Sequence, residues 1–197
     1  MATTFTSQSL SIEIDKEQLA DVKYMLSTVK NGARDAIRRA ANRTATTAQS
    51  RVVKKIYETM SLTQKRIRQD TKILRANYTN LTAKVSVSGK PIPLIEFTHG
   101  KQLKSGINVT VRRGNKVKYR HRFIAEMSSG HIGIFERKLL TGGIRAGRLP
   151  IEEQFGPSTA MVFHFNGEDI VFADSMQIFE KNLDAEINFI LTKAFAK

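Results

Sequence analysis

The hydrophobic period of this chain changes twice along its length, and this change limits its possible folds more than any other feature. Before Asn80, apolar residues recur at the spacing of one helical face. After Asn80 they alternate with polar residues, as on a half-buried strand. From Glu168 the helical spacing returns. This order predicts an α+β fold in which N-terminal helices and a C-terminal helix pack on a mainly antiparallel β-sheet.

Local signals divide the N-terminal part into three predicted helices. Two capping-box patterns mark helix starts, namely Asp15 with Gln18 and Ser61 with Gln64. The Asn31-Gly32 pair stops or kinks the first helix, and the third is expected to reach about Asp70. The second helix, from Ala33 to Ile56, carries a stripe of mainly Ala and Thr. Such small side chains allow another element to approach closely.

Short strands are predicted for the central part of the chain. Alternating or apolar runs indicate strands at residues 81–87, 93–98, 107–111, 117–123 and 132–134. The Arg113-Gly114-Asn115 turn joins two of them in a β-hairpin, which favours antiparallel pairing. Residues 141–147 read as a glycine-rich loop, and an aromatic patch at Phe163 and Phe165 precedes the last helix.

These elements predict a single domain over residues 1–197. It would comprise a helical N-terminal part (1–76), a β-rich part (77–158) and a C-terminal helical part (159–197). A length of 197 residues is enough to bury a sizeable core. No internal repeat or low-complexity tract interrupts this order.

The charge is strongly basic and unevenly distributed. Lys and Arg number 32 against 18 Asp and Glu, which gives a net charge of +14. Residues 1–148 carry +19 and residues 149–197 carry −5. This split suggests complementary surfaces that meet within one molecule or between neighbouring copies. The excess predicts an acidic partner, which is nucleic acid, an anionic surface or an acidic protein, unless the charge is merely solvated.

Several protein classes are excluded by composition. The absence of cysteine excludes disulfides, thiolate metal sites and cysteine nucleophiles. No apolar run approaches the roughly 18–20 residues needed to span a bilayer. The N-terminal residues lack the basic and apolar regions of a signal peptide. These observations favour a soluble intracellular protein.

No catalytic, cofactor or metal site is predicted. The four histidines, which show no metal-ligand spacing, are His99, His121, His131 and His164. Adjacent Glu152 and Glu153 would point away from each other on a strand. The glycines match no phosphate-binding fingerprint, and no nucleophile-elbow motif occurs. We therefore expect a protein that is not an enzyme.

The return strand of the hairpin carries the most distinctive surface. Every second residue of this strand is a cation, namely Lys116, Lys118, Arg120 and Arg122. The residues between and after them are Val117, Tyr119, His121 and Phe123. Because side chains alternate across a strand, the cations should form one row about 20 Å long, which Arg112 and Arg113 extend around the turn. The row could follow DNA phosphates, face an acidic neighbouring subunit or be a solvated face. It lacks aromatic side chains for stacking bases, which argues against single-strand recognition.

One segment carries a resemblance to a known family. RLPIEEQFGPS, residues 148–158, resembles the signature of the phage minor tail protein Z family, the tail-completion proteins of long-tailed bacteriophages and prophages. The motif residues are Arg148, Leu149, Pro150, Ile151, Glu152, Phe155, Gly156 and Pro157. Weaker collinear matches are 41–45, 89–94, 109–114, 123–125 and 129–135, so the likeness covers roughly residues 35–158. Residues 163–167 depart from the family pattern.

The motif residues also have plausible roles in the chain itself. Pro150 limits pairing at a strand edge, and Leu149 and Ile151 bracket it with apolar contacts. Gly156-Pro157 is expected to force a turn. The motif therefore either anchors a backbone conformation or forms part of an interface.

The resemblance implies a structural virion protein at the head-proximal end of the tail, assembled in the host cytoplasm. It implies a homo-oligomeric ring of six copies around the axial DNA channel. The implied partners are tail terminator or tail tube proteins and head-closure or connector proteins, with possible contact to the genome end and no membrane. The alternatives are a free basic DNA-binding protein without sequence specificity and an auxiliary subunit of an unrelated assembly.

Overall fold

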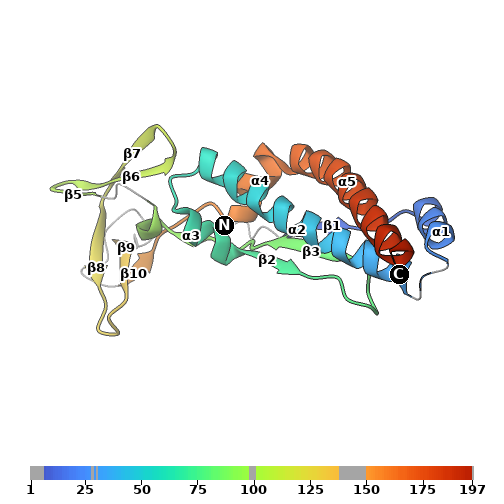
Figure 1. Cartoon of the computed structure of the whole chain (residues 1–197). Coiled ribbons are helices and arrows are strands. Elements are labelled where there is room, and N and C mark those ends of the chain that lie inside the picture. The colour runs from blue at the N-terminus through green and yellow to red at the C-terminus, as the bar shows by residue number, and fades with distance from the viewer. Residues whose placement is uncertain (1–6, 28, 30, 98–100, 138–149, 197) are drawn as a thin grey trace.

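The computed structural model describes residues 7–27, 29, 31–97, 101–137 and 150–196. The molecule is elongated, with a helical body towards one end and most of the small strands at the other (Figure 1). The combination of helices and antiparallel strands confirms the predicted α+β class. The strands are divided among several small sheets.

The elements have the following bounds. The helices are α1 (Lys16–Met25), α2 (Gly32–Thr59), α3 (Gln64–Asp70), the 3₁₀ helix η1 (Leu94–Glu96), α4 (Thr159–Asn166) and α5 (Glu168–Phe195). The strands are β1 (Gln8–Ile12), β2 (Thr71–Leu74), β3 (Ala83–Val87), β4 (Ile92–Pro93), β5 (Lys101–Leu103), β6 (Gly106–Arg112), β7 (Asn115–Arg120), β8 (Arg122–Glu126), β9 (Ile132–Arg137), β10 (Ile151–Glu153) and β11 (Phe155–Gly156). The sheets have the strand orders β1-β3-β2, β5-β6-β7, β10-β9-β8 and β11-β4.

The first two helices begin where the sequence predicts. The Asp15 carboxylate accepts a hydrogen bond of 2.8 Å from the backbone N–H of Lys16, which caps α1. Asn31 adopts a left-handed φ of 60° immediately before α2, so the predicted break at Asn31-Gly32 is confirmed. Helix α1 ends already at Met25, because the chain turns there towards the start of α2.

The predicted start of the third helix is wrong by two residues. Thr63 caps α3, and its hydroxyl accepts a hydrogen bond of 3.3 Å from the backbone N–H of Arg66. Ser61 is buried, and its backbone N–H donates to the carbonyl of Val111 on β6 at 2.9 Å. This hydrogen bond to the β-rich end holds Ser61 in place before the helix begins. No local sequence pattern indicates such a long-range contact.

The close packing of α2 and α5 dominates the helical body. Both helices are 28 residues long and lie along each other (Figure 1). The buried side chains of α2 are mostly small and include Ala36, Ala40, Ala41, Thr44, Ala45 and Ala48. The two backbones approach closely enough for the Asn182 side-chain amide of α5 to donate to the Thr44 hydroxyl at 3.0 Å. Nearby, Arg51 of α2 forms an ion pair with Asp174 of α5.

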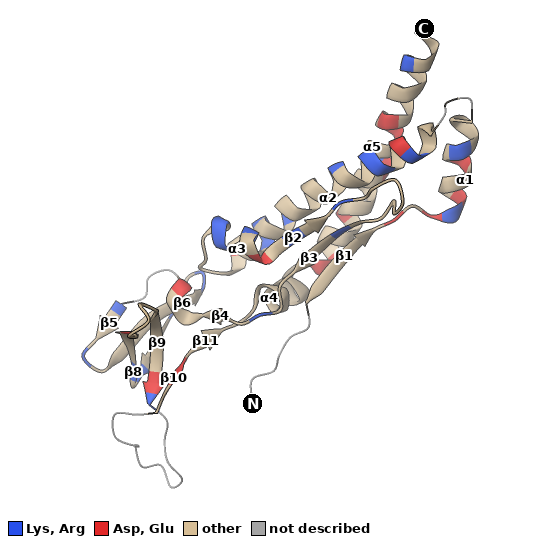
Figure 2. Ribbon diagram, turned by 90° about the horizontal axis from the view of Figure 1, so that it is seen from below, with Lys and Arg blue, Asp and Glu red and all other residues tan. Residues whose placement is uncertain are grey.

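The β1-β3-β2 sheet completes the helical body as a second layer. Figure 2 shows α2 and α5 on one side of its strands. On β3 the side chains of Ala83, Val85 and Val87 are buried, whereas Lys84 and Ser86 between them are half-buried. This alternation matches the predicted strand at 81–87 and places the core between the sheet and the helices.

The strand predicted at residues 93–98 is wrong over most of its length. Strand β4 ends at Pro93, and the chain then forms η1; residue 98 lies outside the described residues. Within this turn the backbone N–H of Phe97 donates to the carbonyl of Leu94 at 3.3 Å, and both side chains are buried. A 3₁₀ turn places residues three apart on the same side, so two large side chains reach the core where alternation would separate them.

A short connection joins the β-rich end to α4 and α5. Strand β11 pairs with β4, and Ser158 then caps α4 by accepting a hydrogen bond of 3.2 Å from the backbone N–H of Met161. A Cβ atom on Gly156 would lie only 2.7 Å from the ring of buried Phe97. Glycine is therefore required for this close approach. The C-terminal part predicted to be helical thus contains two helices, and α4 was not predicted as a separate one because eight residues are too few to show a helical period.

The small side chains of α2 should be necessary for the helix pair. Ala40 is fully buried one turn before Thr44, on the side of α2 that faces α5. We expect Ala40→Leu to lower the free energy of unfolding by about 1–3 kcal/mol, because the larger side chain forces the helices apart. Urea denaturation measures this change. The matched variant Ala173→Leu, on an exposed position of α5, should change stability by less than about 0.5 kcal/mol; equal effects of the two would contradict the packing argument.

The contact between Gly156 and Phe97 should appear as a coupling energy. Gly156→Ala is expected to cost about 1–3 kcal/mol, since the added methyl meets the buried ring. In a Phe97→Leu background the ring is gone, and the same substitution should cost much less. A double-mutant cycle measured by chemical denaturation separates the two effects. An equal cost in both backgrounds would show that the ring is not the obstacle.

Candidate assembly surfaces

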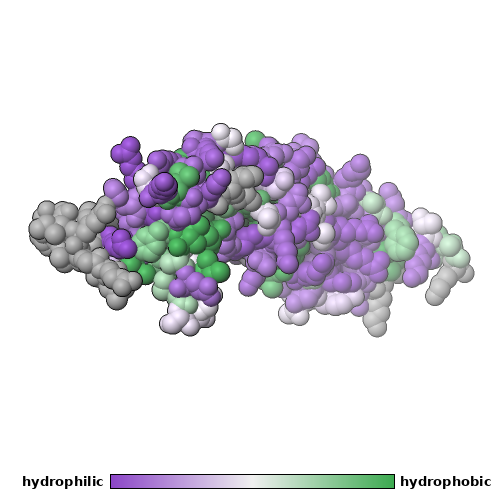
Figure 3. Space-filling model, turned by 90° about the vertical axis from the view of Figure 1, so that its left-hand side faces the viewer, coloured by the Kyte–Doolittle hydropathy of each residue, from purple (hydrophilic) through white to green (hydrophobic). Residues whose placement is uncertain are grey.

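The β7 strand presents a row of exposed cations at the β-rich end. Lys116, Lys118 and Arg120 alternate with half-buried Val117 and Tyr119, as predicted. Strand β7 lies at the edge of the β5-β6-β7 sheet, and among the described residues none of the three cations has an ion-pair partner. Hydrophilic side chains cover most of this end of the molecule (Figure 3). We call Lys116, Lys118 and Arg120 the basic row.

Arg122 does not belong to this row, so the predicted four-cation row is wrong at its last member. His121 adopts a left-handed φ of 65°, which ends β7, and Arg122 begins β8. There its guanidinium donates to the Glu136 carboxylate at 2.9 Å and stacks over the Tyr119 ring at 4.5 Å. The alternating sequence continues through His121, but the backbone turns at that residue. The regular alternation of side chains between the two faces of the strand therefore stops there.

Both arginines at the hairpin turn are exposed, and they differ in their side-chain contacts. Arg113 stacks over the Tyr57 ring at 3.9 Å, and its side chain donates to the Tyr57 carbonyl at 2.8 Å. These contacts attach the hairpin to the last turn of α2. Arg112 is exposed and forms an isolated backbone bridge with Met60. Arg113 is thus primarily a structural residue, and Arg112 can extend the basic row.

The family-motif residues connect three elements. Arg148 and Leu149 lie outside the described residues. Pro150 is exposed and directly precedes the edge strand β10, the position predicted for it. Downstream, the backbone N–H of Gln154 donates to the Ile134 carbonyl on β9 at 2.8 Å, and its carbonyl accepts from Leu94 at 3.0 Å. The motif therefore ties β9 to the β4–η1 segment.

The remaining motif side chains differ in exposure. Ile151 is half-buried, Glu152 is exposed and Phe155 is 52% exposed. Pro157 is half-buried and leads into the Ser158 cap of α4. Phe155 is the motif side chain best placed to contact another protein, because it is large, apolar and solvent-accessible.

The acidic C-terminal part is only partly neutralised within the molecule. Its carboxylates on α5 include Glu186, which pairs with Arg43 at 2.8 Å and Arg39 at 3.7 Å of α2. Three other exposed α5 carboxylates, Asp169, Glu180 and Asp184, make no ion pair with any residue that the structure describes. The complementary surfaces suggested by the charge split thus meet partly within one molecule, and the exposed carboxylates leave an acidic surface on α5.

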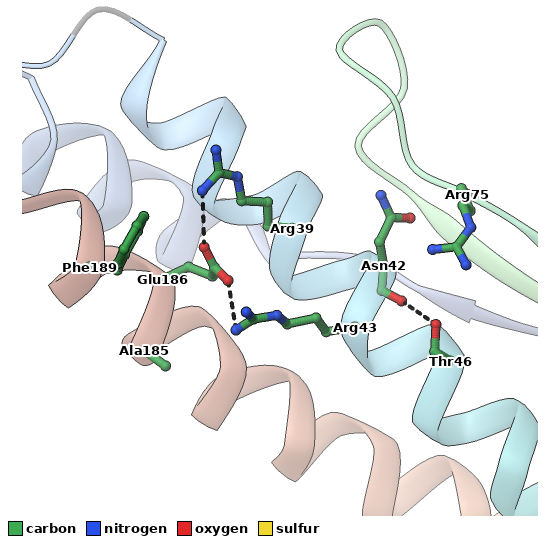
Figure 4. Close-up of a pocket in the computed structure, with 8 residues that line it drawn as sticks. All are labelled: Arg39, Asn42, Arg43, Thr46, Arg75, Ala185, Glu186 and Phe189. Atoms are coloured by element: carbon green, nitrogen blue, oxygen red, sulfur yellow. Dashed lines mark hydrogen bonds and ion pairs between the residues drawn. The ribbon is translucent and has the colours of Figure 1, made fainter. Parts of the chain in front are cut away.

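Tertiary structure assembles a second basic surface that the sequence did not indicate. A pocket of about 530 Å³ lies at the seam of α2 and α5, lined by Arg39, Asn42, Arg43, Thr46, Arg75, Ala185, Glu186 and Phe189 (Figure 4). Arg75, which follows β2, is distant in sequence from the two α2 arginines. Helical spacing alone could have placed Arg39 and Arg43 on one face of α2, one turn apart.

Among the described residues, neither a cluster of three metal ligands nor a membrane-spanning helix is present. Nowhere in those ranges do three His, Asp or Glu side chains gather around a common point that could hold a metal ion. Among the same residues, no helix combines the length and apolar character that crossing a bilayer requires. His131 instead contacts the Glu153 carboxylate at 2.9 Å, and His164 contacts Glu168 at 2.5 Å. His99 lies outside the described residues.

Comparison with known proteins assigns the chain to a family. Neither the curated proteins nor the solved structures include a significant match. The model of the family described as prophage minor tail protein Z (GPZ), however, matches residues 16–197. This range includes α1 and α5, for which the sequence motifs alone gave only a general likeness. The chain therefore belongs to the prophage minor tail protein Z (GPZ) family and is a phage minor tail protein, of a structural and generally non-enzymatic kind.

Proposed function

We propose that this minor tail protein completes the head-proximal end of the tail and helps to join tail and head, as a ring of copies around the axial DNA channel. Membership of the family supports a tail role. The ring is supported by the charge distribution, whereas the head-proximal position rests on the resemblance to tail-completion proteins. Six copies, contacting tail terminator or tail tube proteins on one side and head-closure or connector proteins on the other, are part of this proposal.

The observation that carries the proposal is the separation of two unlike charged surfaces. The basic row lies on edge strand β7 at the β-rich end. The acidic surface, formed by Asp169, Glu180 and Asp184, lies on α5 of the helical body. Contacts between unlike surfaces are heterologous and generate a ring when the rotation between copies closes. In such a ring the basic row of one copy faces α5 of the next.

The edge position of β7 leaves the basic row accessible to a protein partner. Lysines on an edge strand prevent uncontrolled strand pairing, so the cations of β7 protect the free edge before assembly. An acidic neighbour can then cover them without adding a strand. Charged surfaces of this kind increase the association rate and select the correct partner.

Charge reversal in the basic row should weaken self-association. We expect Lys118→Glu with Arg120→Glu to raise the dissociation constant of the oligomer about tenfold or more, because like charges then face α5. Sedimentation equilibrium measures the constant. Lys65→Glu with Arg68→Glu, on the exposed side of α3, makes the same charge change elsewhere and is the matched control. If both pairs weaken association equally, net charge rather than the basic row is responsible.

The proposed position in the virion is tested by removing the protein. Virions produced without it should show defective tail ends or tails detached from full heads in electron micrographs. The complete chain supplied in trans should restore joined particles. Normal tails firmly attached to full heads would disprove the head-proximal role.

The alternative of a free DNA-binding protein predicts a different measurement. A basic row that follows phosphates gives tight duplex binding that weakens steeply with salt. Gel-shift titration at low salt and at about 0.15 M salt tests this directly. Submicromolar binding with a steep salt dependence, lost in the Lys118→Glu/Arg120→Glu variant, would favour DNA. Negligible binding at the higher salt concentration would count against the DNA-binding alternative.

A further inference from the structure

The pocket at the α2–α5 seam holds more positive charge than its own carboxylate can neutralise. The three guanidinium groups of Arg39, Arg43 and Arg75 line it, together with the single carboxylate of Glu186 (Figure 4). The Glu186 side chain is only 4% exposed, whereas those of Arg43 and Arg39 are 64% and 44% exposed. The buried carboxylate therefore holds two guanidinium groups in place while leaving them open to a further anion.

A second pocket continues this surface towards the ends of the two helices. It has a volume of about 270 Å³ and shares Arg39 and Phe189 with the first. Phe189 is 54% exposed and lies between the two pockets, so it offers an apolar contact next to the arginines. We call the two pockets together the seam groove. Its chemistry suits a segment that carries carboxylates and, one helical turn away, a large apolar or aromatic side chain.

Asp35, the other carboxylate at the seam groove, is hydrogen-bonded to residues outside the groove and neutralises only part of the charge of Arg39. Asp35 accepts hydrogen bonds from the Tyr78 hydroxyl at 2.8 Å and from Arg38 at 3.1 Å. Burial alone would raise the pKa of Asp35, but these two hydrogen bonds, together with the positive charges of Arg38 and Arg39, outweigh burial and lower it from its ordinary value. Asp35 is thus ionised and already bound to its own partners. The excess positive charge of the groove remains.

Helix α1 carries the complementary chemistry on its outer face. Glu17 and Asp21 lie one turn apart and Tyr24 follows on the next turn, so all three share one side of the helix. All three are exposed, Tyr24 by 84%, and neither carboxylate has an ion-pair partner among the described residues. Of the ten residues of α1 only Val22 is buried. A covering partner would therefore add substantially to the packing of this short helix.

We propose that the outer face of α1 in one copy docks into the seam groove of the next copy. Glu17 and Asp21 bind Arg43 and Arg75 there, and Tyr24 packs beside Phe189. This inference rests on the proposed ring, because it specifies a second contact between neighbouring copies.

The arrangement of the molecule agrees with such a contact. Helix α1 lies at the end of the helical body to which α5 and the start of α2 run (Figures 1 and 2). The groove and α1 are unlike surfaces, so their contact is heterologous, as a ring requires. The α5 carboxylates fit the groove less well. Glu180 and Asp184 have no large exposed apolar neighbour on the following turn. Asp169, which is followed by exposed Phe172, has no second carboxylate one turn away.

A charge swap between the two surfaces tests the docking. Arg75→Glu and Asp21→Arg, each alone in the full chain, should raise the dissociation constant of the oligomer about tenfold. The double variant should recover most of the lost affinity, because the pair is restored with reversed polarity. Arg75 and Asp21 are exposed and make no ion pair with described residues, so thermal unfolding should change little. Lys72→Glu, with the same charge change on exposed β2, is the matched control.

Several outcomes would overturn the inference. It fails if Arg75→Glu weakens association no more than Lys72→Glu, if the double variant is no better than the single ones, or if the wild-type chain remains monomeric at high concentration. The inference also fails if about 50 mM inorganic phosphate abolishes the difference in dissociation constant between wild type and Arg75→Glu, and if adding Asp21→Arg to Arg75→Glu restores no affinity. That pair of results would indicate a simple anion site.

The test also separates this contact from the proposed function. If only the basic-row variants weaken association, the ring can stand and the α1 contact is refuted. If the charge swap succeeds but virions lacking the protein are normally joined, the contact stands and the head-proximal role is refuted.

Discussion

The close approach of α2 and α5 is the constraint on which the rest of the structure depends. Small side chains on α2 let the helices meet at the Thr44–Asn182 hydrogen bond. This spacing brings Glu186 of α5 into the interior beside two arginines of α2. A buried carboxylate without such partners would be strongly destabilising. The helix pair therefore determines both the core and the charged pocket on its surface.

The β-rich end depends on this helix pair through short, specific contacts. Ser61 and Arg113 attach β6 and its turn to the end of α2. On the other side, the family motif connects β9 through Gln154 to the β4–η1 segment and then to the cap of α4. The motif is thus well explained as a structural connection, in which Gly156 is needed for its approach to Phe97. An additional interface role for exposed Phe155 is compatible with this function.

Charge links the architecture to the proposed assembly. The arginines of α2 neutralise part of the acidic C-terminal helix within one molecule, and Arg122 is bound to Glu136 within the β-rich end. The charges that remain exposed include the basic row at one end, carboxylates on α5 and α1, and the arginines of the seam groove. Surfaces that are unlike and well separated favour head-to-tail contacts between copies. The proposed ring around the tail axis requires contacts of this kind.

The amino-acid sequence by itself determined the class of fold, the first helix cap, the break at Asn31, the β6–β7 hairpin and the resemblance to the tail protein family. These depend on local periodicity, capping and turn chemistry, which act over a few residues. Strands β1 and β2, the 3₁₀ turn at Leu94 and the end of β7 at His121 could not be predicted, because distant contacts or a single backbone angle decide them. The same is true of the candidate surfaces. The sequence indicated the basic row of Lys116, Lys118 and Arg120. Only the tertiary structure showed that Arg122 lies outside this row and that Arg75 lies beside Arg39 and Arg43. Such neighbours arise where elements far apart in the chain pack together.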